Sequence, residues 1–174
     1  MKTELNRSDI SAAGRTFAIV VSRWNDEYTS KLADGAVEAL KEAGADDGAI
    51  DIFYVPGAFE LPVASLRAAE SGEYSAVIAL GVVIRGDTPH FDYVAGQAAS
   101  GLMQASMQTG VPVMFGVITA DNVEQVVVRC GEKNDNKGYE AALSAVESVK
   151  VLREISLRTE HLWEIRKERL LNVV

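Results

Sequence analysis

The chain has 174 residues, of which 48% are hydrophobic and 24% charged, as in one soluble globular domain. Its formal net charge of −8 argues against a general nucleic-acid-binding function, because such proteins present clustered positive charge to the phosphate backbone. A local group of Arg and Lys side chains could still oppose the overall sign and bind a small anionic substrate.

Nothing in the composition points to an oxidising compartment or to a membrane. Cys130 is the only cysteine, so an intramolecular disulfide is excluded. The N-terminal stretch MKTELNRSDI lacks the apolar core of a signal peptide, and the longest apolar run, 76–84, is far too short to cross a bilayer. We therefore expect a cytoplasmic protein with neither nucleic acid nor a membrane as a partner.

The first half of the chain alternates between strands and helices. A β-branched apolar run over 16–22 predicts a buried strand, and residues 25–43 follow with apolar side chains at helical spacing. Residues 50–55 form the next predicted strand. Residues 60–71 then predict a second helix, which ends before Gly72.

The same alternation continues in the second half. Residues 76–84 are the most apolar segment, and a continuous run of this kind is typical of a parallel strand covered on both faces. A helix is predicted over 91–109, although two glycines interrupt it, and a fourth strand over 113–118.

Helical segments close the chain. Asp121 and Glu124 form a capping-box pattern that predicts a short helix to about Arg129. Residues 138–155 predict a longer helix, with apolar side chains along one side.

Strands and helices that alternate with short connections predict a parallel sheet between two layers of helices. We expect a three-layer α/β sandwich with a four-stranded flavodoxin-like sheet, formed by residues 1–155 as a single domain. Residues 156–174 differ in style and predict an extra C-terminal amphipathic helix or tail, with apolar side chains exposed unless they dock on another surface. These side chains are Leu162, Trp163 and Ile165.

Open parallel sheets bind ligands beyond the carboxyl ends of their strands, and those ends carry aromatic and charged residues here. Trp24 and Phe59 each follow a strand and could stack on a flat heterocycle, although core packing is the commoner role of either residue alone. Glu60 could recognise N–H groups or a hydroxyl chain, or could be a favourable charge in the first turn of a helix.

The loop 86–90 is the most informative of these strand ends. Gly86 allows a backbone to approach a ligand closely, and Thr88 offers an N–H and a hydroxyl to an anion. His90 can exchange a proton near neutral pH, and Asp92 could orient it. A solvated loop histidine is the alternative, and the spacing alone does not decide between the two.

Arg129, Lys133 and Lys137 form a basic stretch in an acidic chain. Arg is suited to binding a phosphate through two parallel hydrogen bonds, whereas a single Lys is more simply explained as a solvated surface residue. The sequence has no Walker loop, no GxGxxG fingerprint after the first strand and no metal-ligand spacing. The residues therefore fit acid–base chemistry on a small phosphorylated compound, with no metal and no cofactor.

Several segments together resemble the lumazine synthase family, in that family's order and spacing. They are VPGAFELP (55–62), ALGVVIRG (79–86), TPHFDY (88–93), FGVIT (115–119), EQ (124–125), NKG (136–138) and EAA (140–142). The resemblance covers roughly residues 14–155. It implies an enzyme that condenses 5-amino-6-(D-ribitylamino)uracil with 3,4-dihydroxy-2-butanone 4-phosphate to 6,7-dimethyl-8-ribityllumazine, the penultimate step of riboflavin biosynthesis, releasing phosphate and water. The substrate's own amine attacks the ketone, so the protein must supply positioning and proton transfer more than a nucleophile.

The resemblance also implies a role for each site residue. Trp24 would stack on the pyrimidine, where the family more often has Phe, and His90 would transfer protons. The other side chains around the ribitylaminouracil would be Ala58, Phe59, Glu60, Val82, Val83 and Ile84. Asp87 and Thr88 would contact the butanone phosphate.

By the same resemblance, the neighbouring subunit of a ring completes each site. It would supply Phe115 and Lys137 to the ribitylaminouracil, with Phe115 over the ring system, and Arg129 to the phosphate. The partners implied are small-molecule substrates, further copies of the chain in a homopentamer or a 60-subunit icosahedral shell, and riboflavin synthase.

Three features depart from the family pattern. Asp87 places a carboxylate in the phosphate loop, so we expect only its backbone to contact the ligand. Cys130 stands beside Arg129, where a small apolar residue is usual, and residues 156–174 extend past the usual family end. Two other functions stay open at this point: a self-assembling shell or scaffold protein, and a flavin- or lumazine-binding module without turnover.

Overall fold

In the computed structural model of the chain, residues 10–171 are described, with side chains as far as Trp163. Four strands form one parallel sheet in the order β2-β1-β3-β4. Their bounds are β1 Phe17–Ser22, β2 Ile50–Val55, β3 Ala76–Ile84 and β4 Val113–Ala120. The central strands β1 and β3 are buried along nearly their whole length, whereas β2 is an edge strand with exposed side chains.

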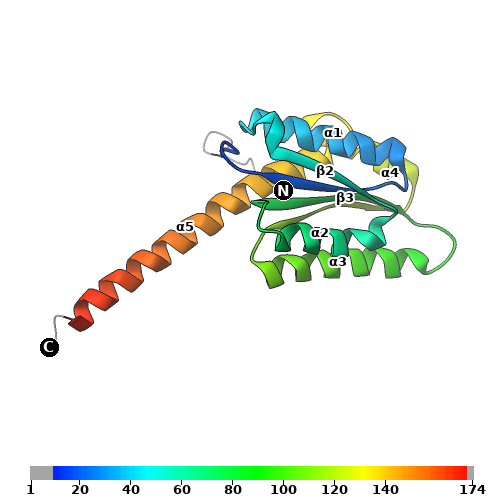
Figure 1. Ribbon diagram of the computed structural model, residues 1–174. Coiled ribbons are helices and arrows are strands. Elements are labelled where there is room, and N and C mark those ends of the chain that lie inside the picture. Colours follow the sequence, from blue (N-terminus) through cyan, green and yellow to red (C-terminus); the bar gives the residue numbers. More distant parts are fainter. Residues whose placement is uncertain (1–9, 172–174) are drawn as a thin grey trace.

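Helices cover both faces of the sheet (Figure 1). One face carries α1 (Asp26–Glu42), the short α4 (Val123–Val127) and the first part of α5 (Lys137–Leu171). The other face carries α2 (Leu61–Glu70) and α3 (His90–Thr109). Single turns of 3-10 helix lie at η2 (Asp47–Ala49), η3 (Ala58–Glu60) and η4 (Lys133–Asp135). This arrangement confirms the predicted three-layer α/β sandwich.

Each face of the sheet has its own apolar cluster. Ile19 of β1 belongs to the same cluster as Leu32 of α1. Val20, the next residue, belongs to the cluster on the opposite face, with Leu102 of α3. Successive side chains of a strand point to opposite faces, so a strand between two helical layers must be apolar at every position. The continuous apolar runs of the sequence have this cause.

β2 and β3 have the bounds that the sequence predicted, but β4 is two residues longer than expected. Thr119 and Ala120 continue the strand because they pair with Val83 and Ile84 at the end of β3. The polar side chain of Thr119 did not indicate a strand. Thr119 is part of β4 because it pairs with Val83, which is distant in the sequence.

The longer β4 changes how α4 begins. Asn122, not Asp121, is the N-terminal cap, and its side chain accepts a hydrogen bond from the backbone N–H of Gln125 at 3.0 Å. The backbone N–H of Asp121 instead donates to the side chain of Gln125 at 2.9 Å. The predicted capping box of Asp121 and Glu124 was therefore wrong, and α4 is shorter than expected, ending at Val127.

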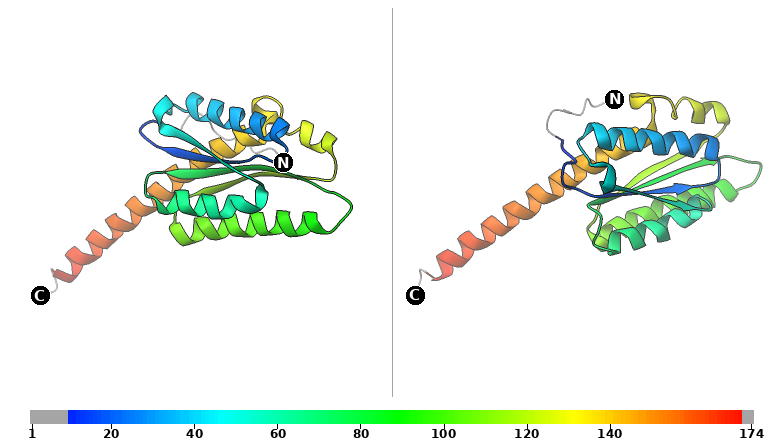
Figure 2. Two further views of the ribbon diagram at one scale, coloured as in Figure 1. Left: turned by 45° about the vertical axis from the view of Figure 1, so that its right-hand side comes forward. Right: turned by 45° about the horizontal axis from the view of Figure 1, so that its top comes forward.

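α5 is one unbroken helix, so residues 156–171 continue it and do not begin a separate helix. Both views of Figure 2 show its distal part leaving the body of the molecule. Leu162 and Trp163 are exposed, as the sequence predicted, and Leu157 is exposed with them. The side chain of Ile165, predicted to share this exposure, lies outside the described part of the chain.

Candidate active site

The turn after β1 is tied to the strands on both sides of it. The backbone N–H of Trp24 donates to the carbonyl oxygen of Pro56, after β2, at 3.1 Å. The side-chain amide of Asn25 donates to the carbonyl oxygen of Val82 in β3 at 2.9 Å. Asn25 has a left-handed backbone with φ 61°, a conformation that Asn tolerates better than most residues. These bonds fix Trp24 between the carboxyl ends of β2 and β3.

Aromatic side chains stand out from this edge of the sheet. The side chain of Trp24 is 70% exposed and that of Phe59 is 58% exposed, so neither belongs to the core. An exposed aromatic ring beside a strand end is available to a flat ligand. The structure therefore excludes core packing, the commoner role that the sequence had left open for both residues.

The carboxylate of Glu60 holds its own turn together. Its Oε2 accepts a hydrogen bond from the backbone N–H of Gly57 at 2.9 Å, and Ala58 is buried beneath the turn. The structural role considered for Glu60 is thus present. A carboxylate has lone pairs on both oxygens, so this one bond leaves it able to accept others.

The loop after β3 is exposed from Arg85 to His90, including Asp87 and Thr88. Behind it, Val82 is buried, and Val83 and Ile84 are half-buried. His90 is the first residue of α3, and its backbone N–H lies 3.4 Å from the hydroxyl of Thr88. This places the imidazole of His90 beyond the carboxyl end of a central strand.

Asp92 does not orient His90, contrary to the sequence-based suggestion, because its carboxylate pairs with Arg85. Arg85 also donates to Asp121 and lies over the ring of Phe91, 4.1 Å from its centroid. The hydrogen bonds to Asp92 and Asp121 raise the pKa of the Arg85 guanidinium, which stays charged. Sequence reasoning gave Arg85 no role. Its contact with Asp121 arises because β3 and β4, which are distant in the sequence, pair in the sheet.

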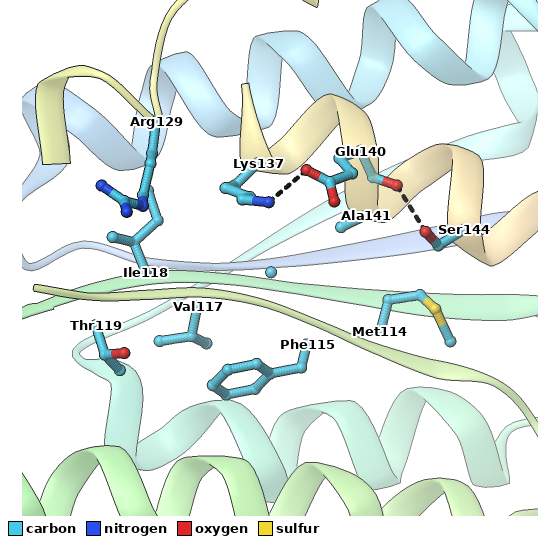
Figure 3. A pocket seen from close by; sticks show the side chains of 11 residues that line it. Met114, Phe115, Val117, Ile118, Thr119, Arg129, Lys137, Glu140, Ala141 and Ser144 are labelled. Carbon is cyan, nitrogen blue, oxygen red and sulfur yellow. Dashed lines mark hydrogen bonds and ion pairs between the residues drawn. The ribbon is translucent and has the colours of Figure 1, made fainter. Parts of the chain in front are cut away.

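A pocket of about 450 Å³ lies against the edge strand β4 (Figure 3). Phe115 and Thr119 of β4 line it, together with Arg129 and the first turn of α5. Arg129 and Lys137 both lie at the side of this pocket, and Arg129 donates to the carbonyl oxygen of Gln125 at 2.6 Å. The two cations make the pocket suitable for an anion. The ring of Phe115 lies on the other side of β4 from them (Figure 3).

Glu140 and Ser144 also line this pocket, and sequence reasoning gave them no role. The carboxylate of Glu140 forms an ion pair with Lys137 one helical turn earlier. Residues 137, 140, 141 and 144 share one face of α5, so helical spacing from Lys137 was a usable signal. Lys133, the other basic residue of this stretch, lies elsewhere: its ammonium donates to Glu42 of α1 at 2.6 Å, which raises its pKa.

The predicted site residues thus form two groups on one chain. Trp24, Phe59, Glu60 and His90 follow β1, β2 and β3, while the pocket beside β4 holds Phe115, Arg129 and Lys137. The structure brings the members of each group together and leaves the two groups at different places on the sheet.

Two further features bear on the class of protein. Among residues 10–163, whose side chains are described, His, Cys, Asp and Glu do not gather in threes as a metal ion would require. No helix in the described part of the chain is long and apolar enough to cross a membrane.

A parallel α/β sandwich with aromatic, acid–base and anion-binding residues at its strand ends is typical of an enzyme that acts on small molecules. Residues 14–153 match the family described as 6,7-dimethyl-8-ribityllumazine synthase. A relative, the 6,7-dimethyl-8-ribityllumazine synthase of Chlorobium chlorochromatii (strain CaD3), is 48% identical over 155 residues, which cover 89% of this chain and all of the relative. The chain belongs to the 6,7-dimethyl-8-ribityllumazine synthase family.

Proposed function

We propose that the chain condenses 5-amino-6-(D-ribitylamino)uracil with 3,4-dihydroxy-2-butanone 4-phosphate at a site divided between two subunits. As a member of its family it is a transferase of riboflavin biosynthesis, and the product is 6,7-dimethyl-8-ribityllumazine. The amine of the uracil attacks the ketone, and the steps that follow release water and phosphate. Positioned proton transfer is the chemistry that these steps require.

One half of the site would be the edge formed by the ends of β2, β1 and β3. There the ring of Trp24 stacks on the pyrimidine, and Phe59 and Glu60, with the buried Ala58, hold the ribityl chain. The last residues of β3, Val82 to Ile84, line the same pocket. His90 exchanges the protons, and the exposed loop with Asp87 and Thr88 contacts the butanone phosphate.

The other half would be the pocket beside β4 of the neighbouring subunit. Its Arg129 binds the phosphate through charged hydrogen bonds, and its Lys137 contacts the ribitylaminouracil. Phe115 covers the face of the ring opposite Trp24. Asp87 then contributes only its backbone, because a carboxylate turned toward the phosphate would repel it.

The separation of the two groups is the observation that carries this proposal. His90 begins α3 on one face of the sheet and Arg129 follows α4 on the other face (Figure 1), yet both would have to act on one substrate. Trp24, Phe59 and Phe115 all leave large aromatic surfaces in solvent. A second copy that sets its β4 pocket against the strand ends would cover these rings and unite both groups.

A homopentamer in the cytoplasm is the assembly we propose, either alone or as the unit of a 60-subunit icosahedral shell. Support comes from exposed apolar side chains beyond the site, among them Met103 and Met107 on α3 and the row Ile52, Phe53 and Tyr54 on edge strand β2. Riboflavin synthase, which would use the product, is a further proposed partner. Electron microscopy of the purified protein distinguishes pentamers from shells.

The test of the reaction is turnover with both substrates. We expect the absorbance and fluorescence of the lumazine to appear together with one equivalent of inorganic phosphate, faster than in the protein-free mixture. A rate equal to the uncatalysed reaction, from protein shown to be folded and assembled, would contradict the proposed function and favour a binding or scaffold role.

A further inference from the structure

We infer that Asn136 positions Arg129 for the phosphate substrate although its own side chain lies outside the pocket. The inference rests on the function proposed above and concerns the loop 129–137. This loop begins at Arg129 and ends where α5 begins at Lys137, so its two ends carry the two cations of the pocket. Whatever fixes the shape of the loop also fixes the distance between these charges.

The ends of the loop are joined by backbone hydrogen bonds. The N–H of Lys137 donates to the carbonyl oxygen of Arg129 at 2.9 Å, and the N–H of Gly131 donates to the carbonyl oxygen of Asp135 at 3.1 Å. Cys130 and Asn136 form an isolated antiparallel bridge between them. Arg129 is therefore held against the first residue of α5, and opening of the loop would move Arg129 away from this helix.

The side chain of Asn136 closes this loop from inside. It is 3% exposed, and its Nδ2 donates to the carbonyl oxygen of Gly131 at 3.0 Å and to that of Lys31 in α1 at 2.9 Å. Its Oδ1 accepts from the backbone N–H groups of Gly138 at 2.9 Å and Tyr139 at 3.1 Å. A carboxamide has two N–H donors and two lone pairs, so all of its hydrogen-bonding capacity is used. One side chain thus connects the loop, α1 and the first turn of α5.

Two glycines make room for this arrangement. A Cβ atom on Gly35 of α1 would lie 2.6 Å from Oδ1 of Asn136, and one on Gly138 would lie 1.9 Å from the carbonyl oxygen of Leu32. The amide is therefore held directly against the backbone of α1, where α5 begins. Asn136 is thus supported by α1 and α5, two helices packed on the sheet, and not by a solvated loop alone.

Only an amide satisfies this position. Aspartate has the same shape but would turn an oxygen toward the carbonyl groups of Gly131 and Lys31. Serine could still accept from the first N–H groups of α5, but it is too short to reach the other two partners as well. The variants Asn136→Ser and Asn136→Asp therefore separate the cap of α5 from the connection between the loop and α1.

The test combines two measurements: the KM of each substrate and the rate at which the thiol of Cys130 is labelled. In Asn136→Ser we expect the KM for the butanone phosphate to rise about tenfold or more, while the KM for the ribitylaminouracil changes less than about twofold. When Asn136→Ser is added to Arg129→Ala, the KM for the phosphate substrate should rise little further, because Asn136 acts through Arg129. Loss of folded protein alone would lower kcat and leave both KM values unchanged.

Cys130 reports on the loop without any substrate. It is the only cysteine and is 7% exposed. It lies between Arg129 and Gly131, whose backbone N–H donates to the carbonyl oxygen of Asp135. An aromatic disulfide reagent should label it at least about tenfold faster in Asn136→Ser than in the wild type, measured on folded protein. Leu102→Val is the control, because it weakens the apolar cluster on the opposite face of the sheet and should leave this labelling and both KM values unchanged.

Unchanged Cys130 labelling together with an unchanged KM for the butanone phosphate would overturn the positioning role. Equal rises of the two KM values would overturn it as well, since the effect would then not pass through Arg129. If Asn136→Asp does not fold, the serine variant carries the test. If the wild type makes no lumazine, the proposed function fails, whereas Cys130 labelling and binding of inorganic phosphate still decide the role of Asn136.

Discussion

The carboxylate of Asp92 faces the guanidinium of Arg85, with Asp92 Oδ1 3.1 Å from Arg85 Nη2 and Oδ2 3.3 Å from Nη1. Through Nε the same guanidinium donates to Asp121 at 2.9 Å. Arg85 thereby links the beginning of α3 to the residue after β4, on either side of the loop that carries Asp87 and Thr88. Asp92 contributes to the shape of this loop and is not the partner that sets the imidazole of His90.

Asp92→Asn should therefore be mild. The ion pair is largely exposed and screened by solvent, so its loss should change the free energy of unfolding very little. We expect kcat within roughly threefold of the wild type, whereas His90→Ala should slow condensation by about 10²- to 10⁴-fold after subtraction of the uncatalysed rate. Steady-state kinetics of both variants decide the matter. An Asp92→Asn enzyme as slow as His90→Ala would mean that Asp92 does act through the histidine.

Arg129→Ala should mainly impair use of the butanone phosphate. Removal of one charged hydrogen-bonding partner costs roughly 1.5–3 kcal/mol of binding. Arg129→Lys keeps the charge without the paired N–H groups and should recover only part of the loss. Titration of each substrate at saturating concentrations of the other measures the effect. Weaker binding of the ribitylaminouracil, with the phosphate substrate unaffected, would show that Arg129 has a different role.

A site divided between subunits allows two inactive variants to restore each other. Neither His90→Ala nor Arg129→Ala has an intact site as a homo-oligomer. If the two are unfolded, mixed equally and reassembled at random in a ring, about a quarter of neighbouring pairs combine an intact His90 with an intact Arg129 in the required order. Activity should then exceed that of both parents.

Native mass spectrometry must first confirm that the oligomers are mixed. If both residues came from one chain, mixing could never unite them. Mixed rings no more active than the parental average would then refute the divided site, while turnover by the wild type would be unaffected by that result.

Deletion of residues 157–174 should leave turnover and the oligomer intact. Every residue assigned to the site precedes this segment. The middle of α5, at Val151 and Leu152, lies beside Pro112 at the amino-terminal end of β4, so the helix leaves the body opposite the strand ends that carry His90. Kinetics and size-exclusion chromatography of the shortened chain test this. Loss of both activity and assembly would show that the segment belongs to the central interface.

The sequence predicted the strands because their burial on both faces requires unbroken apolar runs, as in Ala76–Ile84. It did not predict the start of α4, since Asp121 and Asn122 are both good capping residues and the pairing of β4 with β3 selects between them. The partner of Asp92 escaped prediction because Arg85, seven residues earlier, is brought to it by the course of the loop between β3 and α3. The continuity of α5 did have a signal, because no glycine or proline follows Gly138.

The site shows a similar division. Short motifs indicated which residues gather at strand ends, and the exposure of Trp24 and Phe59 agrees with a ligand-facing position. The motifs could not indicate that the amide of Asn136 lies against α1 or that it is saturated with hydrogen bonds. These properties depend on how closely α1 and α5 approach, which two distant glycines, Gly35 and Gly138, determine together.

The unbroken α5 also makes the C-terminal part of the chain a spacer of fixed length. Residues 156–171 extend the helix by about 24 Å at ~1.5 Å per residue. A label or cargo protein attached along this arm would be held away from the sheet in a fixed direction, on the side remote from the substrate. In any ring of copies related by rotation, all such attachments would point to the same side.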